Sequence, residues 1–180
     1  MLNLSMATAQ TLTPNPGAWR PMAYANLQKV SPVTATYAEI WRDLIELNNR
    51  AYRAQGDTRF ADGNAPATEA HFVIWSRQRS VVLSILNTAR DCSRKTADPV
   101  AHVTIKLCPM RLAVYEGIEL RTMNAGRGCV LETDGVLRFD AGSSGAYASY
   151  DIPTKTVKTG LIVNHAAVDG CSFNVPLERH

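Results

Sequence analysis

The spacing of apolar residues predicts one clear helix in the first half of the chain. Between residues 36 and 55, apolar side chains recur at steps of three and four, which is the period of a helix with one buried face. Thr36 and Glu39 have the spacing of a capping box, which satisfies free N–H groups at a helix start. Gly56 favours termination, because glycine readily adopts the left-handed conformation that ends many helices. The predicted apolar stripe comprises Tyr37, Ile40, Trp41, Leu44, Ile45, Asn48, Ala51 and Tyr52.

A second broad apolar face follows a polar loop over 57–67. The spacing from Thr68 to Cys92 favours a second helix, although the run 72–75 (Phe-Val-Ile-Trp) is also typical of a buried strand. Two amphipathic helices joined by a loop of this length predict an antiparallel helical hairpin over 36–95.

After Pro99 the apolar positions alternate with polar ones, which is the pattern of half-buried strands. The alternation is clearest over 101–107, and Gly117 divides the strands expected over 110–123. Asp134-Gly135 lies between two apolar runs and predicts a tight hairpin turn. Further strands are expected over 146–152, 157–164 and 171–177. Strands this short and this closely spaced predict an antiparallel β-sandwich over 100–180.

Residues 1–35 follow neither pattern. They contain four prolines and no acidic residue, a composition that favours extended backbone. Ordering such a segment costs about 1–2 kcal/mol per residue, so it must pack on the chain's own body or on a neighbouring subunit. The candidate interface residues are Trp19, Met22, Tyr24 and Leu27. The predicted fold class is α+β: an N-terminal extended arm (1–35), a helical hairpin (36–95) and an antiparallel β-sandwich (100–180).

Composition and charge exclude several classes. The 180 residues are 46% apolar and 19% charged, as in globular domains, and no apolar run approaches the roughly 18–20 residues of a membrane-spanning helix. The net charge of +3 is concentrated between Arg77 and Lys95. Aromatic residues are not interleaved there, so a solvated surface is favoured over a nucleic-acid contact. The first residues lack the basic and apolar parts of a secretory signal, so we expect cytoplasmic synthesis.

The candidates for chemistry are weak. Cys92, Cys108, Cys129 and Cys171 form no C-x-x-C pair, so no zinc site or other cofactor is predicted. Their even number permits two disulfides, but their sparse spacing favours buried small apolar residues in a reducing compartment.

The turn around Asp169 offers the only nucleophile candidate. His165, Asp169 and Cys171 could form a Cys–His pair, but a strand end and a turn at Asp169-Gly170 account for the same residues. Four aspartates near predicted strand ends are interpreted as solvated loop carboxylates and not as a calcium site: Asp134, Asp140, Asp151 and Asp169. No catalytic residue is predicted, so we expect that the protein is not an enzyme.

Two resemblances bear on function. Residues 145–153 resemble the G-x-Y-x-x-Y-x-x-P strand of jelly-roll carbohydrate-binding modules, which implies a β-sandwich with a glycan as an alternative ligand. Tyr147 and Tyr150 would then form the sugar platform, although we favour Tyr147 in the core. The whole layout is similar to small virion structural proteins of tailed phages. That resemblance implies a virion subunit (tail, adaptor or capsid-associated) that forms homo-oligomers and contacts neighbouring structural subunits through its arm and sandwich. The alternative is a carbohydrate- or ligand-binding sandwich with a helical adaptor.

Overall fold

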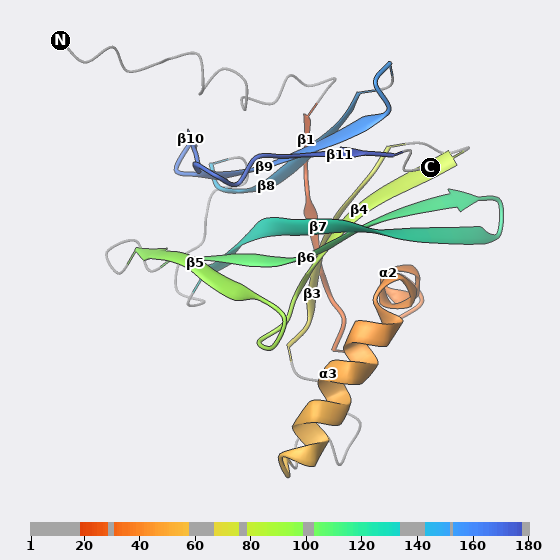
Figure 1. Cartoon of the computed structure of the whole chain (residues 1–180), viewed down its shortest axis with the longest axis vertical. Coiled ribbons are helices and arrows are strands. Elements are labelled where there is room, and N and C mark those ends of the chain that lie inside the picture. The colour runs from red at the N-terminus through yellow and green to blue at the C-terminus, as the bar shows by residue number, and fades with distance from the viewer. Residues whose placement is uncertain are drawn as a thin grey trace. The chain divides into compact units, whose positions relative to one another are not determined.

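The computed structural model describes residues 19–28, 31–57, 67–75, 79–98, 103–133, 143–151 and 153–177. These residues form two antiparallel β-sheets and two helices (Figure 1), so the predicted α+β class with antiparallel sheets is confirmed. The chain divides into two compact units. One takes its described residues from within 1–22, 94–106 and 128–180, and the other from within 23–93 and 107–127.

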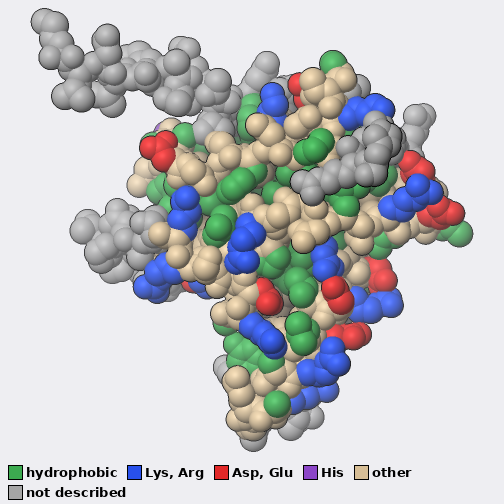
Figure 2. Space-filling view, viewed as in Figure 1, with side chains coloured by type: hydrophobic (Ala, Val, Ile, Leu, Met, Phe, Trp, Pro, Cys, Tyr) green, Lys and Arg blue, Asp and Glu red, His purple; other side chains and the backbone are tan. Residues whose placement is uncertain are grey.

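The predicted helix over 36–55 is present as two consecutive helices, α2 (Ala35–Ile40) and α3 (Arg42–Ala54). Trp41 separates them with a non-helical backbone (φ −115°, ψ 12°). The chain leaves α3 as predicted, through Gly56 at φ +74°. Positive and negative side chains are interspersed around α3 (Figure 2), as expected for a solvated helix surface. The exposed charged residues of α3 are Arg42, Asp43, Glu46, Arg50 and Arg53.

The predicted capping box of Thr36 and Glu39 is wrong, because the reciprocal bonds form earlier in the chain. The Ser31 N–H donates to Thr34 Oγ1 (2.8 Å), and the Thr34 N–H donates to Ser31 Oγ (3.3 Å). Glu39 in α2 instead forms an ion pair with Arg42, the first residue of α3. The two bonds between Ser31 and Thr34 close the turn over 32–34 that leads into α2, and Pro32 in this turn has no N–H that would need a partner.

The larger sheet, sheet B, contains the strands next to the helices. Its order is β2-β3-β4-β6-β5, and β7 also pairs with β6. The bounds are β2 (Ala23–Asn26), β3 (Glu69–Ile74), β4 (Arg79–Asn87), β5 (Ser93–Asp98), β6 (Val103–Glu116) and β7 (Glu119–Thr133). Side chains of β2, β3, β4 and β6 pack against α2 and α3 around the fully buried Trp41.

The predicted second helix over 68–92 is wrong, and with it the helical hairpin over 36–95. This segment forms the antiparallel strands β3 and β4, with Phe72 opposite Ser84. The cause is burial on both faces of β4, where every residue from Val81 to Asn87 is buried. A strand covered on both faces appears in the sequence as one continuous apolar run, which periodicity does not separate from a buried helix.

The smaller sheet, sheet A, has the order β1-β8-β9-β10, and β11 also pairs with β9. The bounds are β1 (Trp19–Pro21), β8 (Gly145–Asp151), β9 (Thr156–Val163), β10 (Ala166–Ala167) and β11 (Phe173–Pro176). The three strands predicted at the end of the chain correspond to β8, β9 and β11. The predicted hairpin turn at Asp134-Gly135 lies outside the described residues.

Residues 19–28 of the predicted arm pack on the chain's own body. β1 pairs with β8 in sheet A, and β2 pairs with β3 in sheet B, so the chain changes sheets at Met22. The Met22 N–H donates to the Ala146 carbonyl (2.8 Å), and the Leu27 N–H donates to the Thr68 carbonyl (2.9 Å). Both side chains are buried, at 9% and 1% exposure. Residues 1–18 of the arm lie outside the described part of the chain.

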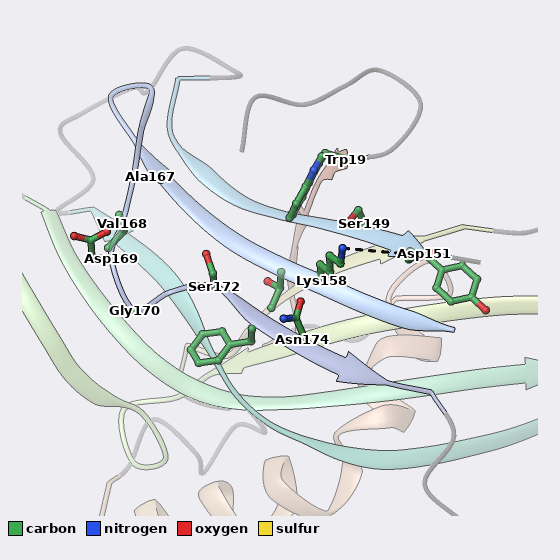
Figure 3. Close-up of a pocket in the computed structure, with 13 residues that line it drawn as sticks. Trp19, Ser149, Asp151, Lys158, Ala167, Val168, Asp169, Gly170, Ser172 and Asn174 are labelled. Atoms are coloured by element: carbon green, nitrogen blue, oxygen red, sulfur yellow. Dashed lines mark ion pairs between the residues drawn. The ribbon is translucent and has the colours of Figure 1, made fainter. Parts of the chain in front are cut away.

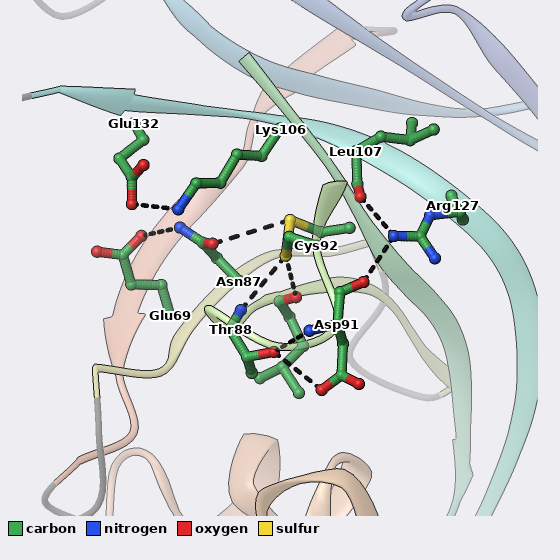
Figure 4. The surroundings of a disulfide bond; sticks show 11 residues. Glu69, Asn87, Thr88, Asp91, Cys92, Lys106, Leu107, Arg127 and Glu132 are labelled. Atoms are coloured by element: carbon green, nitrogen blue, oxygen red, sulfur yellow. Dashed lines mark hydrogen bonds and ion pairs between the residues drawn. A yellow bond between two sulfur atoms is a disulfide. The ribbon is translucent and has the colours of Figure 1, made fainter. Parts of the chain in front are cut away.

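The interpretation of the cysteines as reduced is wrong. Cys92 is bonded to Cys108, and Cys129 is bonded to Cys171. Around the first disulfide (Figure 4), the Thr88 N–H donates to Cys92 Sγ (3.3 Å) in the turn between β4 and β5. Sequence spacing gave no sign of either pair, because strand pairing and not sequence distance brings the partners together.

Candidate functional site

Sheet A carries an open groove of about 580 Å³ (Figure 3). Its floor is a row of side chains on four neighbouring strands. Trp19 on β1 lies opposite Ser149 on β8, Ser149 lies opposite Lys158 on β9, and Lys158 lies opposite Asn174 on β11. Directly opposite residues of antiparallel strands project from the same face of a sheet. The register therefore places an indole, a hydroxyl, an ammonium and an amide side by side.

The charged groups of the groove are weakly paired. Lys158 Nζ lies 4.0 Å from Asp151 Oδ2, and their side chains are 46% and 33% exposed. An ion pair at this distance and exposure contributes little to stability, so both groups remain accessible to a ligand. At the rim, Lys95 Nζ donates to the Gly170 carbonyl (3.1 Å) and holds the turn between β10 and β11.

The structure separates the residues singled out from the sequence. Trp19 and Tyr150 line the groove. Tyr147 is only 3% exposed, which confirms its predicted place in the core and excludes it from a sugar platform. Cys171 is 1% exposed and bonded to Cys129, so it has no thiol to act as a nucleophile.

Of the predicted interface residues, Tyr24 alone is well exposed, at 56%. Met22 and Leu27 are in the core, and Trp19 is half-buried. Lys158 and Asn174 were not predicted as site residues. The polar positions of a strand indicate only exposure, so no pattern in the sequence groups these two residues with Trp19.

The second feature is the turn that joins β6 to β7. Gly117 has φ +64°, and the side chain of Ile118 is fully exposed. Glu119 and Arg121 follow on β7 with 68% and 72% of their side chains exposed. We call residues 116–121 the hairpin tip. Its exposed apolar residue is followed by a glutamate and an arginine, Glu119 and Arg121, which lie 3.5 Å apart as an exposed ion pair within the chain.

The third feature is a polar cluster that joins the helices to sheet B. Arg111 on β6 donates from Nη1 and Nη2 to the two carboxylate oxygens of Asp43 (2.6 Å each), and from Nη1 to the Ile40 carbonyl (2.7 Å). The hydrogen bonds from Arg111 to its carboxylate hold the pKa of Asp43 below its ordinary value. The guanidinium also lies 4.7 Å from the centre of the Trp41 ring. All of these contacts are internal, so we interpret the cluster as a structural clamp.

His71 on β3 is an ionisable group in an apolar setting. Its Nε2 is buried without a hydrogen-bond partner, and the ring lies edge-on to Tyr24 at 6.1 Å. Burial lowers the pKa of His71 from 6.5 to about 4. Glu69, two residues before it on β3, hydrogen-bonds with Asn87.

We expect His71 to make the fold sensitive to acid. The unfolded chain binds a proton at His71 below about pH 6.5, and the folded chain does so only near pH 4, so its contribution to stability is complete above pH 6.5. As the pH falls from 6.5 to 4, up to about 3 kcal/mol is lost. Urea unfolding of His71→Phe should show a smaller loss over this range than wild type. The control His165→Asn changes an exposed histidine and should follow wild type. Equal losses in wild type and His71→Phe would contradict the prediction.

Among the described residues, no three His, Cys, Asp or Glu side chains are grouped closely enough to hold a metal ion. None of the described helices has the length and apolar character needed to span a bilayer. No protein-family model matches the chain, and no curated protein or solved structure matches it either.

Proposed function

We propose that the chain is a structural subunit that assembles with copies of itself and with neighbouring subunits, in a particle such as a virion. The hairpin tip is the observation that supports this most. Ile118 is the most exposed of the large apolar side chains in the described part of the chain. Contact with a second subunit would remove this side chain from water, which is the usual source of association energy.

The strand that follows the tip supports the same proposal. Within the described residues, β7 pairs with β6 and with no other strand, so its outer edge can accept a further strand. The regular part of this edge is short, because the strand bends at Gly126. There the backbone has φ +85°, and the Gly126 N–H donates to Asn124 Oδ1 (2.9 Å).

A second copy of the chain is the partner that we propose for the tip. In a two-fold dimer, residue i of one copy contacts residue j of the other, and residue j contacts residue i. Glu119 and Arg121 have opposite charges, so a two-fold axis near Leu120 would place each beside its counterpart. The same surface is then complementary to itself.

The disulfides and the resemblance to tailed-phage virion proteins support a particle as the setting of the assembly. Disulfides persist in oxidising surroundings and are rare in the cytosol. Two disulfides in one chain therefore suit a particle that leaves the cytoplasm after synthesis.

Substitution of the tip tests the proposal. We expect wild type to have a native mass at a multiple of 19.7 kDa by light scattering, and Ile118→Lys to shift it toward 19.7 kDa. Val33→Lys is the matched control, because Val33 is an 81% exposed aliphatic residue in the turn before α2 and not part of the hairpin tip. A wild type that stays monomeric at high concentration would contradict assembly. Equal effects of the two substitutions would contradict the role of the tip.

A further inference from the structure

We propose that the groove on sheet A binds a neutral saccharide. This inference is independent of the assembly proposal, because it rests on the Trp19–Ser149–Lys158–Asn174 row and not on the hairpin tip. A sugar ring has an apolar C–H face and a rim of hydroxyl groups that both donate and accept hydrogen bonds. The row offers a counterpart to each.

The apolar counterpart is the indole of Trp19. Trp19 is half-buried, with its backbone fixed by pairing with Ser149, and it lines the groove. A large, flat ring held on a strand gives a stacking surface that loses little conformational entropy when a ligand binds. Figure 3 shows Trp19 at one end of the row and Asn174 at the other, with Ser149 and Lys158 between them.

The polar counterparts follow on the next strands. Asn174 is exposed and has an amide that donates and accepts, Lys158 donates, and Asp151 accepts. Neighbouring strands lie about 4.8 Å apart, so the row of four strands is roughly 14 Å long. That length suits a short oligosaccharide better than a single sugar ring.

The charge of the lining favours a neutral ligand. Among the described lining residues, Asp151 and Asp169 contribute two carboxylates and Lys158 one ammonium, and the Lys95 ammonium lies at the rim on the Gly170 carbonyl. These charges balance, so the described lining offers no excess of cations to hold phosphate, nucleic acid or acidic sugars. The exposed charges on the floor likewise disfavour a wholly apolar ligand, which would bury them without hydrogen bonds.

The first test is an array of immobilised neutral, sulfated and sialylated oligosaccharides. We expect binding to neutral glycans. The best-bound glycan is then titrated in solution into protein labelled with 5-fluorotryptophan, which carries three labels at Trp19, Trp41 and Trp75. The ¹⁹F resonance of Trp19 is identified by its absence from the spectrum of Trp19→Phe. Only this resonance should shift when the glycan is added. A shift confined to another tryptophan would overturn the proposed site.

Variants complete the test. Trp19→Ala and Asn174→Ala should each raise the dissociation constant about tenfold or more. Asn174→Ala changes an exposed side chain, so it remains informative even where Trp19→Ala disturbs folding. Tyr24→Ala is the matched control, because it removes an exposed aromatic ring on sheet B and should leave binding unchanged.

Three results would overturn the proposal: no binding to any neutral glycan, preference for acidic glycans, or binding that survives both Trp19→Ala and Asn174→Ala. The assembly proposal is judged separately on the same proteins. Ile118→Lys should keep its glycan affinity, and Asn174→Ala should keep its native mass.

Discussion

Replacing Cys129 and Cys171 by alanine should lower the free energy of unfolding by about 4 kcal/mol. The two residues are 42 positions apart, and closing a chain loop of that length restricts the unfolded state strongly. A small domain has only about 5–15 kcal/mol of stability in total, so this loss is a large share. Both cysteines are buried, so alanine avoids placing a polar group in the core.

The second disulfide provides the comparison. Cys92 and Cys108 are 16 positions apart, so their joint replacement by alanine should cost about 1 kcal/mol less. Urea unfolding of both double variants shows which disulfide contributes more to the free energy of unfolding. A larger loss for the Cys92–Cys108 pair would contradict the loop argument, and four reactive thiols in native wild type would contradict both bonds.

Trp41→Ala should cost about 3–5 kcal/mol, the usual range for truncating a buried aromatic residue. Trp41 is fully buried in the core between the helices and sheet B. Its indole N–H donates to Ser84 Oγ (2.6 Å), and Arg111 lies over its ring. Alanine would leave a cavity, an unpaired hydroxyl on Ser84 and a cation without its aromatic partner.

Two further variants separate these contributions. Trp41→Phe keeps a ring under Arg111 and removes the N–H, so it should cost less than Trp41→Ala. Leu47→Ala is the control, because Leu47 lies on α3 but is 38% exposed. It should change the free energy of unfolding by much less than either Trp41 variant. A Trp41→Ala protein with the wild-type urea midpoint would show that the ring contributes nothing.

The sequence predicted the elements that have one buried face. The helix over 36–55 packs one face against sheet B, so its apolar residues recur with the helical period. The break at Trp41 leaves this period intact. Alternation likewise predicted the start of β6, where Val103 and Ile105 are buried and the residues between and after them are half-buried. β4 was mistaken for helix because both of its faces are buried, which removes the alternation that identifies a strand.

The candidate site was predictable only in part. Trp19 stood out as an apolar residue that needed a partner, and pairing with β8 supplies one. Its neighbours Lys158 and Asn174 lie far along the chain, and only the strand register brings the three together. Local patterns carry no information about such register, which is also why neither disulfide was predicted.

The pairing of β1 with β8 also governs the order of events while the chain is being made. Trp19 lies opposite Ser149, so the ribosome must add 130 further residues before the partner of Trp19 exists. At about 5–20 residues per second, that interval is roughly 6–26 seconds. β2 meets its partner sooner, because Tyr24 lies opposite His71. β1 therefore waits longer for its partner strand than β2 does, and until β8 has been made the indole of Trp19 cannot take its place on sheet A.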